Sequence, residues 1–170
     1  MTVQIRSEAP ADVPAIRALT EAAFLHAPHT SHTEQFIVDA LRAAGELTVS
    51  LVAVDRGELV GHVALSPVTL SDGSPGWFGL GPISVAPARQ REGIGGQLIE
   101  HALDVLRARQ AAGCVLLGDP GYYQRFGFTP EPTLVLPGVP AEYFQAIVLD
   151  GLVPAATATV RYSDAFEARE

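Results

Sequence analysis

The stretch VAPARQREGIGGQLI, residues 85–99, combines the end of an apolar run, a glycine cluster and the start of a helical pattern. Three glycines fall within four positions, at Gly93, Gly95 and Gly96, and from Ile94 the apolar residues recur at helical spacing. The first turn of a helix has unpaired N–H groups and a partial positive charge, and glycine lets a bulky anion approach the backbone. The stretch therefore predicts a phosphate-binding loop between a strand and a helix.

Two common phosphate loops do not fit this stretch. A dinucleotide loop needs Gly-x-Gly-x-x-Gly, but the sixth position counted from Gly93 is Leu98, and counted from Gly79 it is Ser84. A Walker loop needs a lysine, and all eleven basic residues of the chain are arginine. The missing lysine also excludes a Schiff-base lysine. A nucleotide hydrolase and a dinucleotide oxidoreductase are therefore disfavoured, and the pattern that remains is Gln90-x-x-Gly93-x-Gly95.

Composition limits the class of protein further. The 170 residues are 48% hydrophobic, which suits one domain with a core, and no apolar run is long enough to span a membrane. Cys114 is the single cysteine, so no internal disulfide forms, and the N-terminus lacks the features of a secretory signal. The net charge of −8 argues against a nucleic-acid partner. We expect a cytoplasmic protein that binds neither nucleic acid nor a membrane.

Hydrophobic periodicity predicts an α/β (α+β) fold. The expected sheet is mixed, mostly antiparallel and twisted, with helices on both faces and a central β-α-β crossover. Expected helices lie in 9–24, 33–45 (capped by Thr33 and closed by Gly45), 94–113 (closed by Gly113) and around 122–126. Expected strands lie at 3–6, 48–54, 58–65, 77–85, 114–117 and in the C-terminal region 133–162.

The glycine loop and a second segment together resemble the GNAT superfamily of acyl-CoA-dependent N-acetyltransferases. That family carries Gln/Arg-x-x-Gly-x-Gly/Ala at the start of its long central helix, and this chain has ISVAPARQREGIGGQLI. After the next strand the family has an aromatic-Tyr pair, a basic residue and Gly-Phe, and this chain has GYYQRFGF at 121–128. The two signatures cover 80–128 and stand in the family's order. The resemblance implies one N-acetyltransferase domain over 1–170.

The resemblance implies that acetyl-CoA is the cosubstrate. The amides from Arg91 to Gly96 would wrap its pyrophosphate, and the strand edge at 83–85 would pair with its pantetheine arm. Arg89 and Arg91 either add charge near the phosphates or are solvated surface residues. Many relatives have an asparagine where this chain has GDP at 118–120, which puts one pantetheine contact in doubt. The implied cofactor-binding residues are Ile83, Ser84, Val85, Gln90, Arg91, Glu92, Gly93, Ile94, Gly95 and Gly96.

Tyr123 occupies the family's general-acid position. An amine attacks the thioester carbonyl, and CoA leaves as a thiolate. A thiol has a pKa of about 8.5 and a tyrosine one of about 10, so a hydrogen-bonded tyrosine can deliver the proton. Tyr122 is the neighbouring alternative, and both rings could instead pack in the core.

The general base and the acceptor site are less defined. Glu34, His62 and Ser66 are candidates for the base, and each could equally be an ordinary core or surface residue. His29, His32 and Glu34 lie in or beside the loop where the family shapes its acceptor pocket. We therefore expect His29, His32, Glu34, His62 and Ser66 as substrate-site residues. His26, His29 and His32 do not suggest a metal, because Pro28 interrupts the helix that would align them.

The sequence thus predicts an acetyl-CoA-dependent N-acetyltransferase acting on a primary amine of a small molecule or a peptide. Its acidic balance favours a cationic acceptor. A non-catalytic acyl-CoA-binding or regulatory domain is the alternative that the missing base leaves open. A homodimer is compatible with the sequence but not indicated by it.

Overall fold

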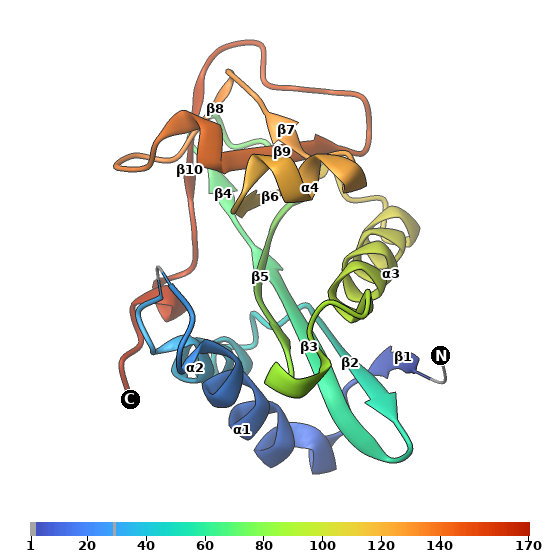
Figure 1. Cartoon of the computed structure of the whole chain (residues 1–170). Coiled ribbons are helices and arrows are strands. Elements are labelled where there is room, and N and C mark those ends of the chain that lie inside the picture. The colour runs from blue at the N-terminus through green and yellow to red at the C-terminus, as the bar shows by residue number, and fades with distance from the viewer. Residues whose placement is uncertain (1–2, 29) are drawn as a thin grey trace. The chain divides into compact units, whose positions relative to one another are not determined.

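The computed structural model describes residues 3–28 and 30–170, which form two compact units joined through shared elements (Figure 1). The first unit contains the described residues up to Ser66, together with 81–103 and 164–170. The second contains 67–80 and 104–163. Strand β5 (Trp77–Val85) and helix α3 (Ile94–Ala108) each contribute residues to both units.

The first unit is built on an antiparallel hairpin. β2 (Val49–Asp55) pairs with β3 (Glu58–Pro67), and β1 (Gln4–Ser7) pairs with the other edge of β2. Arg56 and Gly57 make the turn with φ values of +54° and +79°, the left-handed pair that a tight hairpin requires. The hairpin expected from the sequence is confirmed.

Helices cover both faces of this hairpin. On one face Ile16 of α1 (Val13–Phe24) and Val38 of α2 (Glu34–Ala43) pack with Val52 of β2. On the other face a Cβ atom added to Gly61 would lie 2.9 Å from the Leu98 side chain of α3. Glycine at this position therefore allows α3 to pack closely on β3. The remaining short helices of this unit are η1 (Pro10–Asp12), η2 (Pro87–Arg89) and η5 (Asp164–Glu167).

The second unit contains the parallel strand pair. The first residues of β5 pair in parallel with β6 (Gly113–Leu117), and α3 connects the two strands, as the expected β-α-β crossover requires. β9 (Phe144–Val148) pairs antiparallel with β6 and with β7 (Thr129–Pro130). A three-stranded sheet has the order β4 (Thr69–Leu70), β10 (Ala158–Arg161), β8 (Leu134–Val135). Three short helices complete the unit: α4 (Pro120–Tyr123), η3 (Gln124–Phe126) and η4 (Ala141–Tyr143).

Two expected helix ends differ from the structure. The central helix stops at Ala108, and Gly113 instead begins β6. A Cβ atom added to Gly113 would lie 2.4 Å from the Trp77 ring, so this position requires glycine. Thr33 does precede α2, but its side chain makes no cap hydrogen bond, because the Thr33 hydroxyl contacts that of Ser31 at 2.5 Å. Within 3–28 and 30–170, no helix combines the length and apolar character needed to cross a membrane.

Candidate functional site

The glycine loop of the first unit presents the free end of a helix. α3 begins at Ile94, and the first bond of the helical ladder runs from the Gln97 N–H to the Gly93 carbonyl at 3.1 Å. The N–H groups of residues 94–96 therefore precede the ladder and are available to an anion. Gly93 has a φ of +85°, and the space where its Cβ would lie is open. The buried Ile94 side chain fixes the helix start in the core.

Ion pairs restrain the loop before the helix. Arg89 bonds to the carboxylates of Glu92 and Asp55, each at 3.0 Å, and these partners raise its pKa above the usual value. Arg89 is therefore committed to carboxylates rather than free for phosphate. The Gln90 side chain donates to the Val85 carbonyl at 3.3 Å and links the loop to the end of β5. Arg91 is exposed and has a φ of +66°.

The strand before the loop alternates in burial. Ile83 and Val85 are half-buried, whereas Ser84 is 2% exposed and its hydroxyl has no hydrogen-bond partner among the described residues. The Ala86 N–H donates to the Val60 carbonyl at 2.9 Å, which ties the end of β5 to β3. Gly81 has a φ of +137°, a conformation that favours glycine, and marks a bend in β5.

Tyr123 lies in the second unit, at the end of α4, with its ring packed in an aromatic group. Its ring stands edge-on to Tyr122 at 4.9 Å and to Phe128 at 6.2 Å between centroids. Burial raises the pKa of the Tyr123 hydroxyl to about 12, and Tyr122 and Asp119 add to the effect. The hydroxyl therefore stays protonated throughout the neutral range.

The Tyr123 ring packs directly against the backbone of Gly118. A Cβ atom on Gly118 would lie 2.3 Å from Cε2 of the ring, so this contact requires a residue without a side chain. Two hydrogen bonds of 3.0 Å hold Gly118 in place: its N–H donates to the Tyr143 carbonyl, and its carbonyl accepts from the Gln145 side chain. Gln145, from β9, is 1% exposed. Sequence reasoning missed Gln145, although a polar residue inside the apolar run of β9 is a recognisable signal.

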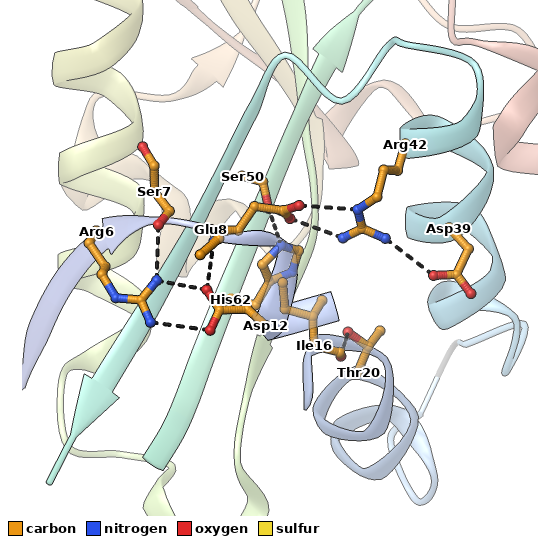
Figure 2. Close-up of polar contacts among 11 residues, drawn as sticks. Arg6, Ser7, Glu8, Asp12, Ile16, Thr20, Asp39, Arg42, Ser50 and His62 are labelled. Atoms are coloured by element: carbon orange, nitrogen blue, oxygen red, sulfur yellow. Dashed lines mark hydrogen bonds and ion pairs between the residues drawn. The ribbon is translucent and has the colours of Figure 1, made fainter. Parts of the chain in front are cut away.

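A buried chain of polar side chains lies on the face of the first unit that α1 and α2 cover (Figure 2). The His62 Nε2 lies 2.8 Å from the Ser50 hydroxyl, which donates to Glu8. Arg42 of α2 donates two hydrogen bonds to the same carboxylate, at 3.0 and 3.1 Å. Burial opposes ionisation of Glu8, but the bonds from Arg42 and Ser50 outweigh it and lower its pKa. Sequence reasoning missed Glu8, Ser50 and Arg42, although Ser50 interrupts an apolar strand in the same way as His62.

His62 and Ser66 are both completely buried in β3. Burial lowers the pKa of His62 to about 4, so its imidazole is neutral at pH 7. The Nδ1 of His62 and the hydroxyl of Ser66 have no hydrogen-bond partner among the described residues. Both residues are therefore placed behind the surface of the unit, and a contact with substrate at either one stays a prediction.

The loop between α1 and α2 borders a pocket of about 290 Å³, lined by Glu21, Phe24, Leu25, His32 and Gln35. His32 thus lies in a hollow of the surface, with a φ of +60°. One carboxylate oxygen of Glu34 accepts from the Thr30 hydroxyl at 2.7 Å, and the other is buried with no hydrogen-bond partner among the residues that the structure describes. His29 lies outside the described residues. Over 3–28 and 30–170, no three metal-ligating side chains come together.

The sequence and the fold are similar to those of known proteins. Residues 4–130 match the family model of the acetyltransferase (GNAT) domain. The uncharacterized N-acetyltransferase YhbS of Escherichia coli K12 is 40% identical over 125 residues, which are 73% of this chain and 72% of YhbS.

Two solved structures agree closely with this one. A GNAT family acetyltransferase from Brucella melitensis, in complex with acetyl-CoA, is 48% identical, with a TM-score of 0.84 over 96% of this chain and 97% of that one. The structure of Escherichia coli YhbS in complex with CoA is 35% identical, with a TM-score of 0.89 over 98% of this chain and 93% of that one.

The chain therefore belongs to the GNAT family and is an N-acetyltransferase, as the two sequence signatures predicted. Its mixed sheet with the parallel β5–β6 pair is the fold expected for that class. The alternative of a non-catalytic binding domain loses its support, because both the family and its relatives are acetyltransferases.

Proposed function

We propose that the chain transfers the acetyl group of acetyl-CoA to a primary amine, with the pyrophosphate held at the glycine loop. The carrying observation is the free helix start at residues 94–96 beside Gly93, whose Cβ position is open. The solved relatives that contain acetyl-CoA and CoA support this choice of cosubstrate. Residues 1–170 would act as one N-acetyltransferase domain in the cytoplasm.

Backbone amides, rather than a cationic side chain, would supply the binding energy for the phosphates. Arg89 is held by two carboxylates, and the chain contains no lysine. Residues 83–85 of β5 would hold the pantetheine arm, and Gln90, Arg91 and Glu92 would shape the approach to the helix. No metal takes part in this proposal.

The amine nitrogen would attack the thioester carbonyl directly, and the carbon–sulfur bond would break to release CoA. Tyr123 would donate a hydrogen bond and then a proton to the leaving sulfur. The ammonium form of the acceptor must lose a proton before it attacks, because a primary amine has a pKa near 10. The acceptor would be a small molecule or a peptide, and the net charge of −8 favours a cationic one.

A thiol-release assay tests the proposal. Purified protein is incubated with acetyl-CoA and, separately, with spermidine, ethanolamine, glycine, an aminoglycoside and a peptide with a free N-terminus. Free CoA is measured with a thiol reagent, and acetyl-CoA binding is measured in parallel by calorimetry. We expect micromolar to millimolar acetyl-CoA binding and turnover with at least one amine. Absence of acetyl-CoA binding by a folded protein would contradict the proposal.

A further inference from the structure

The hydrogen-bond directions in the buried chain determine which nitrogen of His62 carries a proton. Arg42 donates twice to Glu8, and its charge keeps that carboxylate ionised. An ionised carboxylate only accepts, so the Ser50 hydroxyl must donate to Glu8. The Ser50 oxygen then accepts from Nε2–H of His62 at 2.8 Å. The neutral imidazole is thereby held in the tautomer whose Nδ1 carries a lone pair.

This Nδ1 is a buried acceptor without a partner among the described residues. Leaving a buried acceptor unsatisfied costs about 1–3 kcal/mol, so its retention needs a reason. The hydrophobic cluster on this face is formed by Ile16, Val38 and Val52 and does not include His62, so packing of that cluster does not explain the histidine.

A second unsatisfied polar atom belongs to the facing strand. Ala86 N–H bonds to the Val60 carbonyl, and Val68 N–H bonds to the Trp77 carbonyl, so β3 and β5 run in opposite directions. Counting two residues inward from the Ala86–Val60 bond brings Ser84 opposite His62, on the same face of the sheet. The Ser84 hydroxyl is buried and also has no partner within residues 3–28 and 30–170. β5 is the strand proposed to hold the pantetheine arm.

We propose that His62 accepts the proton that the ammonium group of the acceptor loses before it attacks, through a water held between its Nδ1 and Ser84. As an N–H bond of the ammonium breaks, its proton passes to the water, the water passes a proton to Nδ1, and Nε2 gives its proton to Ser50. The Ser50 hydroxyl proton moves to Glu8, whose side chain is 19% exposed and releases it to solvent. No atom changes its oxidation state. The transfer leaves the proton of His62 on Nδ1 and the Ser50 hydroxyl directed at Nε2. Once the product has left, Nδ1 gives its proton to water in the emptied site, and Nε2 regains one from solvent through Glu8 and Ser50, which restores the starting state. This proposal rests on the acetyl transfer proposed above.

The charged groups around His62 suit a transfer residue rather than a proton store. Glu8, which directly follows β1, and Arg42 of α2 are the charged groups that face His62. Arg42 also pairs with Asp39, and Asp39 pairs with Arg17 of α1. Burial is the largest influence on His62 and holds its pKa at about 4, with Glu8 opposing and Arg42 reinforcing that shift. An imidazole with this pKa is unprotonated at pH 7 and passes a proton on rather than retaining it.

A substitution at Ser50 is the decisive test, because it breaks the hydrogen-bonded link between His62 and Glu8 at a residue that does not touch substrate. Ser50→Ala removes the link between His62 and Glu8, whereas Ser50→Thr keeps a hydroxyl. Asp12→Asn is the matched control. Asp12 is a buried carboxylate bound to Arg6 at 2.7 Å, and it is not part of the hydrogen-bonded series of Glu8, Ser50 and His62. The probe is acetyl-CoA with the amine of highest turnover in the panel above. At pH 7 we expect Ser50→Ala to lower kcat by tenfold or more, with an unchanged KM for acetyl-CoA and with near-normal activity in Ser50→Thr and Asp12→Asn.

The pH dependence separates proton transfer from a structural role. As the pH approaches 10 the amine loses its proton to solvent, so the deficit of Ser50→Ala should shrink toward the wild-type rate. A deficit that is constant from pH 7 to pH 10, or no deficit in a folded variant, overturns the proposal. If wild-type protein binds acetyl-CoA but acetylates no amine, the proposed acetyl transfer fails and the role of His62 falls with it.

A spectroscopic measurement is independent of the acceptor. ¹⁵N NMR of labelled imidazole nitrogens should show His62 neutral at pH 7, protonated at Nε2 and unprotonated at Nδ1. A proton on Nδ1, or a charged ring at pH 7, overturns the proposal even where acetyl transfer is demonstrated. The two failures are therefore distinguishable.

Discussion

The hydroxyl of Tyr123 illustrates how burial sets the chemistry of a single residue. Its pKa of about 12 lies well above the value of about 8.5 for a simple thiol, so complete proton transfer to the departing sulfur is uphill. A hydrogen bond to the sulfur as negative charge develops does not require complete transfer, and it is strongest in a dry site. The contribution we propose for Tyr123 is therefore greatest in the transition state.

Tyr123→Phe should lower kcat by about a hundredfold, because it removes the proton donor and keeps the ring against Gly118. Acetyl-CoA affinity and the melting temperature should change little. Steady-state kinetics with the best amine of the panel, and calorimetry, measure these quantities. Tyr122→Phe is the control and should have a smaller effect. A near-normal kcat for Tyr123→Phe, with chemistry rate-limiting, would assign the donor role to Tyr122 or to water.

His62 should make the stability of the fold sensitive to mild acid. Its folded pKa of about 4 lies below the unfolded value of about 6.5, so the unfolded chain binds a proton first as the pH falls. The stabilisation is complete above pH 6.5 and is lost as the pH falls through 4, by about 3 kcal/mol in total. Urea unfolding from pH 7 to pH 4 measures this loss, and His62→Gln should remove that part of it. Equal pH dependence in both proteins contradicts the assignment.

At the scale of elements, the first turn of α3 joins two requirements. Its backbone must be open toward an anion, and its apolar face must pack on β3. Ile94 meets the second requirement by burial, and Gly93, Gly95 and Gly96 meet the first by having no side chain. The Walker alternative fails at this same element, because its lysine is missing.

Gly95→Asp should raise the dissociation constant of acetyl-CoA by tenfold or more, about 1.4 kcal/mol, because it places bulk and negative charge beside the proposed phosphate position. Calorimetry on the folded variant measures the change. His101→Asp is the matched control, since His101 is exposed on the same helix but lies beyond its first turn. Unchanged affinity in Gly95→Asp would move the phosphates away from this loop.

The turn from β6 into α4 should tolerate no side chain at Gly118. Gly118→Ala would bring a methyl group to 2.3 Å from the Tyr123 ring, and overpacking of this kind costs about 1–3 kcal/mol. We expect a lower melting temperature together with a reduced kcat, because the ring must move. In the control Gly121→Ala, the added atom would lie at an ordinary 3.4 Å from Asp119. A fully active and stable Gly118→Ala variant would show that the ring has another resting place.

At the scale of the whole molecule, charge rather than shape limits the partners. The chain contains nineteen acidic residues and eleven arginines. Several of the arginines, including Arg6, Arg42 and Arg89, are bound to carboxylates. Phosphate backbones require clustered free cations, and the sequence contains no basic run.

We therefore expect no association with nucleic acid. Gel-shift and fluorescence-anisotropy titrations with duplex DNA and single-stranded RNA should show no complex at micromolar protein and 50 mM salt. A complex that forms at sub-micromolar protein and weakens with added salt is the contrary result.

Local sequence patterns determined the hairpin β2–β3, the helix α3 and the glycine loop between β5 and α3. Each depends on neighbours within one element: Gly57 supports a tight turn, and the run from Ile94 to Leu106 has a helical period. The aromatic pair at 122–123 was equally readable, because its signature is contiguous. The two-residue strands β4 and β7 were missed, since two residues carry no periodicity.

Only the tertiary structure decided the surroundings of the individual side chains. Glu8, Arg42, Ser50 and His62 come from four separate segments, and the chain they form depends on the register in which Val52 faces His62. The role of Gly118 likewise depends on the Tyr123 ring above it and on Gln145, 27 residues away. Periodicity reports which face of an element is buried, but the partner that a buried polar group meets is set by packing between elements. The sequence therefore predicted the glycine loop at the start of α3, whereas the side-chain contacts on which the proposed proton path depends could be identified only in the tertiary structure.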